Sequence, residues 1–317
     1  MRLGMQGARS SRLWVVIGIV LCAKAGKVSA WNDRGHMIVA AIAYDRLGLE
    51  VRARVDELLR QNPQYANWTK GVAKAQAGKV AFMRAATWPD FIKSAPGYEN
   101  DGNRPSGPDS SRNTGYDDHL QHRYWHYIDI PFSTDGTPLE YPPEPNALTQ
   151  IEAFEEVLAS EEKSDALKSY DLVWLIHLVG DVHQPLHATS RFTKDLPHGD
   201  EGGNRVLLCA RPCRSELHSF WDDILGTSKS PESAIRAANG LGTGPRPGGD
   251  DLMQGDWIAE SVALAKSSVY VSPIGPGAGP YRMTQSYRKA AKLAAENRVA
   301  LAGARLAGVL NDVFERR

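Results

Sequence analysis

Apolar residues recur at helical spacing along most of the chain after residue 30, separated by polar stretches. The pattern predicts helices at about 36–47, 51–60, 72–86, 147–159, 169–183, 217–225, 252–267 and 281–315. Loops rich in Gly, Pro and Asp lie at 94–118, 134–146, 197–204 and 242–251, and such long loops are more often functional rims than linkers. Strands do not alternate with helices, and no repeat or shift in composition divides the chain. We therefore predict one compact all-α domain over 31–317.

The first thirty residues have the pattern of an export signal. Three arginines precede the apolar stretch 13–23, and Val-Ser-Ala at 28–30 is typical of a cleavage site. Those eleven apolar residues are too few to cross a bilayer core, which needs about 20. A lipoprotein anchored at Cys22 is disfavoured because the bulky Leu21 precedes it. We predict a signal peptide over 1–30, a mature chain that begins at Trp31, and a secreted or periplasmic protein without stable membrane association.

The balance of charge bears on the partners of the mature protein. The full chain has 37 basic and 37 acidic residues, and removal of 1–30 takes away five basic residues and no acidic one. The mature chain then carries 32 basic against 37 acidic residues, a net charge of −5. A negative protein does not bind duplex DNA through a broad basic face, so any attraction of phosphate must be local.

Two cysteines remain in the mature chain, Cys209 and Cys213. In an oxidising compartment such a pair favours a small disulfide loop, and a lone pair is poor support for a metal site.

The helix predicted over 169–183 places ionisable residues in apolar surroundings. It is apolar nearly all round from Tyr170 to Val182, which is typical of a central, buried helix, and His177 and Asp181 interrupt it. At a separation of four residues both point to one spot, where an unpaired carboxylate would cost several kcal/mol. We expect Pro185 to end this helix and His187 to lie just beyond it, facing back. A purely structural His–Asp pair is the alternative for one such motif.

The same spacing occurs a second time, in His218 and Asp222 on another helix with an apolar face. Imidazole and carboxylate groups together are typical zinc ligands, and two such pairs favour a metal site over core packing. Further candidate ligands are Asp90 at a helix terminus, His126 in a short apolar segment and His36 near the predicted new terminus. We expect the four remaining histidines to play other parts: His119, His122 and His198 exposed to solvent, and His183 in a hydrogen bond behind the ligands.

Six motifs in this order resemble the zinc-dependent single-strand nucleases of fungi and plants and their bacterial and protozoan relatives: WNDRGH, WPD, WHYIDIP, HLVGDVHQPLH, GGN and LHSFWD, within residues 31–222. The resemblance implies an all-helical fold of the phospholipase C and nuclease type with three zinc ions. The ligands that it implies are Asp90, His126, His177 and Asp181 for one ion; His187, His218 and Asp222 for a second; and the amine and carbonyl of Trp31 with His36 and Asp181 for the third.

The resemblance also implies an activity. The ions form a local site for anions and lower the pKa of water, so hydroxide is present at ordinary pH. We expect phosphodiester hydrolysis of single-stranded RNA and DNA to 5′-nucleotides, with 3′-nucleotidase activity, by a monomer. Asp90 would orient the metal-held hydroxide, and Lys93 would contact the phosphate.

The resemblance places substrate-binding residues beside the metal ligands. Tyr127 would stack on a base and Asp129 would bind the base edge, with Asn204 as a further contact. Only an unpaired base can lie on an aromatic face without being flipped out, which favours single strands. The alternative for Tyr127 is ordinary core packing.

Two residues depart from the pattern of these nucleases. Lys93 stands where many relatives carry Arg and offers a point charge instead of a bidentate contact, and Glu216 stands where Asn is common and adds a carboxylate. A zinc phospholipase C is the alternative enzyme, disfavoured because His36 closely follows Trp31 and because Asp222, not Glu, completes the second site. An exported zinc-binding protein without activity is the other alternative.

Overall fold

The structure is a computed structural model that describes residues 31–315 except 210–212, 214 and 243; the predicted signal peptide lies outside this part. The described helices are α1 (Asp33–Arg46), α2 (Leu49–Leu59), α3 (Tyr65–Thr69), α4 (Ala77–Ala85), α5 (Trp88–Ile92), α6 (Ala147–Ala159), α7 (Asp165–Asp181), α8 (Pro185–Ala188), α9 (Leu217–Asp223), α10 (Pro231–Leu241), α11 (Gln254–Leu264) and α12 (Gln285–Glu315). Short turns of helix are η1 (Lys74–Gln76), η2 (Pro108–Ser111), η3 (Gly115–Asp117), η4 (Arg123–His126) and the π-helical η5 (Ala265–Val269). The prediction of a mostly helical fold is confirmed.

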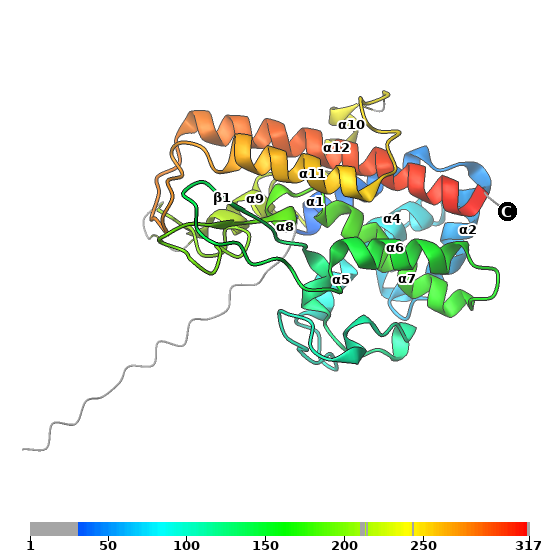
Figure 1. Ribbon diagram of the computed structural model, residues 1–317. Coiled ribbons are helices and arrows are strands. Elements are labelled where there is room, and N and C mark those ends of the chain that lie inside the picture. The colour runs from blue at the N-terminus through cyan, green and yellow to red at the C-terminus, as the bar shows by residue number, and fades with distance from the viewer. Residues whose placement is uncertain (1–30, 210–212, 214, 243, 316–317) are drawn as a thin grey trace, which may run out of the picture.

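Helix α7 forms the centre of this arrangement. Every residue from Lys168 to Asp181 is buried, as an all-round apolar helix requires. The hydroxyl of Ser164 caps its N-terminus by accepting from the backbone of Leu167. Helices α1, α2, α6 and α12 pack against it, and Figure 1 shows α12 running beside α11 along one side of the molecule. The ionisable residues of α7 are therefore enclosed by other helices.

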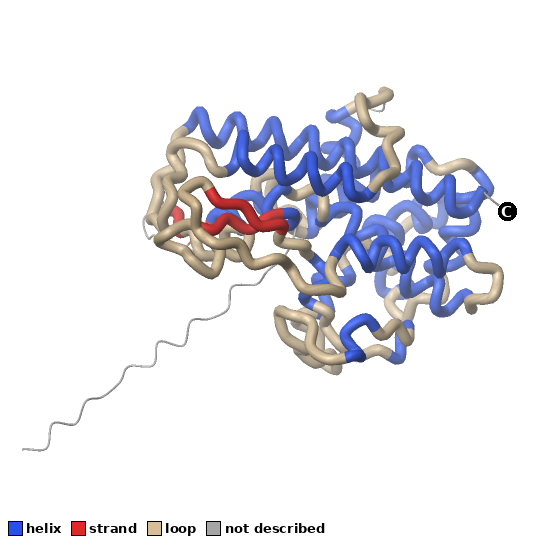
Figure 2. Tube along the Cα trace, in the orientation of Figure 1, coloured by secondary structure: helices blue, strands red, loops and turns tan. Residues whose placement is uncertain are grey.

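Two short pairs of strands accompany the helices. Strands β1 (Ile130–Ser133) and β2 (Thr189–Phe192) pair in parallel, with Ile130 opposite Thr189, and Figure 2 shows them at one end of the helical body. Strands β3 (Leu207–Leu208) and β4 (Ser215–Glu216) pair antiparallel. The sequence did not predict these strands, because segments of two to four residues are too short to show a period. The β1–β2 pair matters for the site, because it follows His126 on one strand and His187 on the other.

The helix boundaries differ from the predictions where local chemistry decides them. Helix α7 ends at Asp181, and Pro185 begins α8 instead of ending α7, since proline is well tolerated in the first turn of a helix. The prediction for Pro185 was therefore wrong. The short helices α3 and α5 and the longer α10 were not predicted. None of the helices in the described part is both long and apolar enough to cross a membrane.

Candidate metal centre

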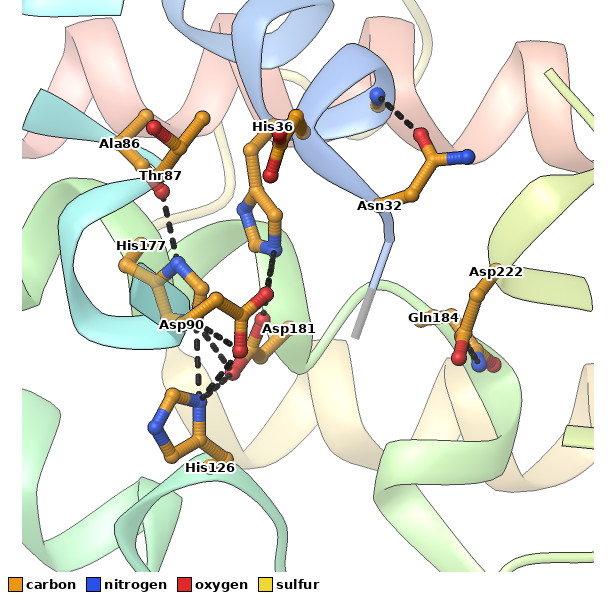
Figure 3. Close-up of polar contacts among 12 residues, drawn as sticks. Asn32, His36, Ala86, Thr87, Asp90, His126, His177, Asp181, Gln184 and Asp222 are labelled. Carbon is orange, nitrogen blue, oxygen red and sulfur yellow. Dashed lines mark hydrogen bonds and ion pairs between the residues drawn. The ribbon is translucent and has the colours of Figure 1, made fainter. Parts of the chain in front are cut away.

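The first group of candidate ligands gathers around the end of α7. Figure 3 shows His177 and Asp181 of α7 facing His36 of α1, Asp90 of α5 and His126 at the end of η4. The Oδ2 atom of Asp181 lies 3.0 Å from Nδ1 of His126 and 3.1 Å from Nε2 of His177. Its Oδ1 atom lies 3.2 Å from Nε2 of His36, and the nearest oxygens of Asp90 lie 3.9 Å from each of the three imidazoles. Asp181 therefore stands between two sets of donors.

A second group lies on the next two helices. His187 comes from α8, and His218 and Asp222 come from successive turns of α9. The Nε2 atoms of His187 and His218 are 3.0 Å apart, and Oδ2 of Asp222 is 3.6 Å from Nε2 of His218. Three sets thus have donor atoms close enough together to hold metal ions: His36, His177 and Asp181; Asp90, His126 and His177; and His187, His218 and Asp222.

Backbone carbonyls fix the protonation of these imidazoles. Nδ1 of His187 donates to the carbonyl of His126 at 2.6 Å, and Nδ1 of His218 donates to the carbonyl of Gly202 at 2.7 Å. The opposite ring nitrogens, Nε2 of His187 and Nε2 of His218, face each other at 3.0 Å. In the same way Nδ1 of His177 donates to the carbonyl of Ala86 at 2.7 Å. Converging ring nitrogens are an arrangement that a cation stabilises.

Burial keeps the imidazoles neutral. Burial lowers the pKa of His36, and the neighbouring imidazole of His177 lowers it further. Burial also lowers the pKa of His177 to about 4 and lowers the pKa of His126 and of His187 well below the ordinary value. Several polar atoms also lack a hydrogen-bond partner: Nδ1 and Nε2 of His36, Oδ2 of Asp90, Nε2 of His126 and Oδ1 of Asp181. Neutral imidazoles and unpartnered oxygens fit a metal ion.

The two central carboxylates differ in their surroundings. Burial raises the pKa of Asp181 to about 7, and the nearby charge of Asp90 adds to this. Burial would also raise the pKa of Asp90, but Lys93, whose Nζ lies 2.7 Å from Oδ1, and the imidazoles of His177 and His36 lower it below its usual range. Asp90 therefore stays ionised, while Asp181 needs a further positive charge to do so.

Trp31 lies against the start of α1. It is fully buried, and a Cβ atom on Gly35 would come within 2.5 Å of its Cβ atom, so only glycine fits at this turn of α1. The next residue, Asn32, caps α1 with its side chain, and its N–H donates to the carbonyl of Asp222 at 3.3 Å. The chain therefore enters α1 beside α9. Coordination through the amine of Trp31 stays a prediction.

The predicted substrate residues line one cavity. Tyr127, Asp129 and Asn204 surround a cavity of about 140 Å³ that also reaches His218. The Tyr127 hydroxyl donates to the carbonyl of Asn103, and Nδ2 of Asn204 donates to the carbonyl of Glu201 at 2.7 Å. Burial, with the carboxylates of Asp200 and Glu201, raises the pKa of Asp129 to about 7. The fold thus brings these residues beside the second group of ligands.

The histidines that were not assigned to metal divide into three kinds. His119 and His198 are exposed, as predicted. The prediction for His122 was wrong: it is fully buried, stacks on Trp125 at 3.5 Å and bonds Asp118 at 2.7 Å. His183 lies outside the three donor sets of the described residues, and its side-chain hydrogen bonds join Val179 and Arg305, not a metal-ligand candidate as predicted.

Three residues that support the ligands were missed. A Cβ atom on Gly180 would lie 2.9 Å from Nδ1 of His36, so its absence lets α1 approach α7. The carbonyl of Gly202 accepts the hydrogen bond from His218. Gly202 has a φ of +59°, and a Cβ atom added to it would lie 2.3 Å from the carbonyl oxygen of Leu186, so only glycine fits there. Nε2 of Gln184 donates to Asp222 at 2.8 Å. All three lie within the motifs HLVGDVHQPLH and GGN, which is the only trace of them in the sequence.

The structure also shows the positions of Glu216 and of the two cysteines. Glu216 and Ser219 form a capping box at the start of α9, in which the hydroxyl of Ser219 accepts from the N–H of Glu216 at 3.2 Å. Glu216 thus caps this helix, a part that Asn also plays at helix starts. Burial raises its pKa. Cys209 and Cys213 form a disulfide with an S–S distance of 2.06 Å, as predicted.

Comparison with known proteins agrees with the geometry. The family described as S1/P1 Nuclease matches residues 31–315. Endonuclease 3 of Arabidopsis thaliana is 26% identical over 334 residues, 97% of each chain. Endonuclease 4 of the same plant is 24% identical over 97% of each chain, and Endonuclease 1 is 27% identical over 67% of this chain and 59% of its own.

Proposed function

We propose that this chain, which belongs to the S1/P1 nuclease family, is a zinc-dependent nuclease. It hydrolyses single-stranded RNA and DNA to 5′-nucleotides and also removes phosphate from 3′-nucleotides. The observation that carries the proposal is the convergence of histidine and aspartate donors into three sets, each with its atoms close enough together to hold a metal ion. Family membership favours this activity over that of a zinc phospholipase C.

The donor groups fit three zinc ions. One ion would be held by Asp90, His126, His177 and Asp181, a second by His187, His218 and Asp222, and a third by the amine and carbonyl of Trp31 with His36 and Asp181. Zinc bound here supplies Lewis-acid chemistry, which lowers the pKa of water and stabilises negative charge on a phosphate. Neutral imidazoles leave that positive charge largely intact.

Asp90 and Lys93 then act on the reacting groups. The ionised Asp90 accepts a hydrogen bond from the attacking water and so orients it. Lys93, paired with Asp90 at 2.7 Å, places a cation where the phosphate gains charge in the transition state. The 3′ oxygen leaves, and a 5′-phosphate results.

Tyr127 and Asp129 would hold the base. Their cavity adjoins His218, so a base stacked on Tyr127 leaves its phosphate near the ligands. A paired base cannot enter this cavity without leaving the duplex, which explains a preference for single strands. We also propose that the protein is a monomer, exported to the periplasm or the medium after cleavage before Trp31.

The test compares substrates and metal content on the same mature protein. We expect about three zinc ions per chain and release of acid-soluble nucleotides from single-stranded DNA at least about 10-fold faster than from duplex DNA. His177→Ala should lose zinc and nearly all activity, because it removes one of the four ligands assigned to the first ion. The exposed His119→Ala, which lines neither cavity at the centre, is the matched control and should keep both.

Three outcomes would contradict the proposal. Normal zinc content in His177→Ala would remove the metal centre as assigned. Release of choline phosphate from lecithin without nucleotide release would indicate the phospholipase C, and bound zinc with no turnover on any of these substrates would indicate a binding protein.

A further inference from the structure

We propose that a second cavity at the metal centre is a subsite for the nucleotide on the other side of the cleaved bond, with Phe91 as the platform on which its base stacks. The inference rests on the proposed nuclease function. It adds a second base-binding position to the one at Tyr127.

The second cavity reaches the candidate metal centre from a different set of residues. It measures about 730 Å³ and is lined by Asp90, Lys93 and Asp222. The Tyr127 cavity reaches the centre at His218 and shares none of these residues. A phosphodiester held at the centre has a nucleotide on each of its two sides. With one nucleotide at Tyr127, the other has the second cavity within reach.

Phe91 offers this cavity an open aromatic face. Helix α5 buries Trp88 and Ile92 in the core, whereas Phe91 lines the cavity and is 52% exposed. The exposed aromatic side chains among the large hydrophobic residues of the described part are Phe91 and Tyr141, and each lines one of the two cavities. A ring left open to water beside a phosphate site is the arrangement that stacks an unpaired base.

The charges around the cavity suit a nucleic-acid strand. Its lining includes four cationic side chains: Arg84, Lys93, Arg123 and Lys229. Lys229 and Lys93 are paired with carboxylates of the same lining, Asp33 at 2.8 Å and Asp90 at 2.7 Å. Arg84 instead donates to the backbone carbonyl of Trp68, which leaves its charge uncompensated by that contact. Arg123 donates to the carbonyl of Lys93 at 3.3 Å, which keeps its guanidinium near the Asp90–Lys93 pair. The strand's phosphates therefore meet the guanidinium groups of Arg84 and Arg123 on leaving the centre.

Three dinucleotides with a single phosphodiester bond test the subsite: one with two bases, and two in which one base or the other is replaced by an abasic sugar. We expect Phe91→Ala to lower kcat/KM on the two-base substrate about 5-fold or more, the loss that a stacked base implies. For this variant, kcat/KM should no longer fall when the base that stacks on Phe91 is replaced by an abasic sugar. For Tyr127→Ala, kcat/KM should no longer fall when the other base is replaced by an abasic sugar.

Controls separate stacking from damage to the neighbouring Asp90. Phe91→Tyr keeps a ring and should restore wild-type ratios, while Phe91→Leu keeps a bulky apolar side chain and should behave like Phe91→Ala. Leu293→Ala removes another exposed apolar side chain that lines neither cavity, and it should leave all three rates unchanged. Zinc content is measured for every variant.

The outcomes are distinct. If Phe91→Ala and Phe91→Leu cleave the three substrates in wild-type ratios, no base stacks on Phe91 and the subsite is overturned, while the nuclease function stands. If the wild-type protein cleaves none of the three substrates, the proposed function fails and the subsite with it.

Discussion

Hydrogen bonds to backbone carbonyls and close packing orient the imidazoles of the candidate metal centre. Carbonyl groups of Ala86, His126 and Gly202 accept from Nδ1 of His177, His187 and His218, which turns Nε2 of each ring toward the other candidate ligands. His36 has no such carbonyl partner, and its position depends on the missing side chain of Gly180. Single glycine and carbonyl positions therefore decide whether these residues act as ligands.

At the residue scale, we predict that Gly180→Ala displaces His36. The added Cβ atom would lie 2.9 Å from its Nδ1 atom, in a helix whose neighbours leave no room to move. We expect fewer zinc ions per chain, measured by metal analysis, and nuclease activity lower by about 10- to 100-fold.

Gly240→Ala is the matched control for this substitution. Gly240 also lies within a helix, α10, but a Cβ atom there meets nothing within 4 Å. The change should keep activity and add up to about 1 kcal/mol to stability, because alanine favours helices. Equal zinc content in the two variants would show that His36 does not depend on Gly180.

At the scale of elements, a buried ion cluster fastens a long loop to the helix that carries His126. His122 precedes η4, stacks on Trp125 and lies 2.7 Å from Asp118 and 3.3 Å from Asp101. Burial would lower the pKa of His122, but its hydrogen bonds to Asp101 and Asp118 outweigh burial and raise the pKa above 6.5. The cluster therefore joins the loop to η4 through an imidazole that binds its proton more tightly than a free histidine does.

This cluster predicts a pH-dependent contribution to stability. The folded state binds the proton of His122 more tightly than the unfolded state, so the contribution is complete below about pH 6.5 and is lost as pH rises through the raised pKa. We expect His122→Gln to lower the free energy of unfolding by about 3 kcal/mol at acid pH and by less at alkaline pH.

Denaturant titrations at several pH values would measure this difference. The exposed His119→Gln is the control and should cost little at any pH. A difference between wild type and His122→Gln that grows with rising pH would mean that His122 is neutral in the folded protein.

At the scale of the whole molecule, the centre joins parts of the chain that are far apart in sequence. Candidate ligands come from α1, α5, η4, α7, α8 and α9, and Trp31 is packed beside α1 where the mature chain is predicted to begin. Metal binding therefore links the helices to one another, and removal of metal should lower the stability of the fold as well as the activity.

The predicted use of the Trp31 amine makes correct processing a condition for activity. An amide nitrogen is not basic enough to replace a free amine as a ligand. We predict that one alanine left before Trp31 lowers activity about 10-fold or more and reduces bound zinc by one ion per chain.

One alanine added after Arg317 is the control and should change neither quantity. Zinc content and single-stranded DNA cleavage would be measured on both proteins. Full activity with the retained residue would mean that the amine is not a ligand.

The sequence by itself determined the helical class, the burial of α7 and the metal-ligand candidates. Helical periodicity and the His-x-x-x-Asp spacing are local properties, and a local pattern is visible wherever it is repeated. The repeat at His218 and Asp222 favoured a metal site over a single structural pair. The Cys209–Cys213 disulfide was also predictable, because its two cysteines are close in sequence.

Only the tertiary structure decided which polar residues are buried and what supports the ligands. His122 looks solvated because polar residues surround it in sequence, yet folding places it between two carboxylates and a tryptophan ring. The parts played by Gly180 and Gln184, and the second cavity beside Phe91, depend on contacts between helices that are distant in sequence. Such contacts produce no repeating pattern of residues in the sequence. They arise from the close packing of separate elements, which exists only once the chain is folded.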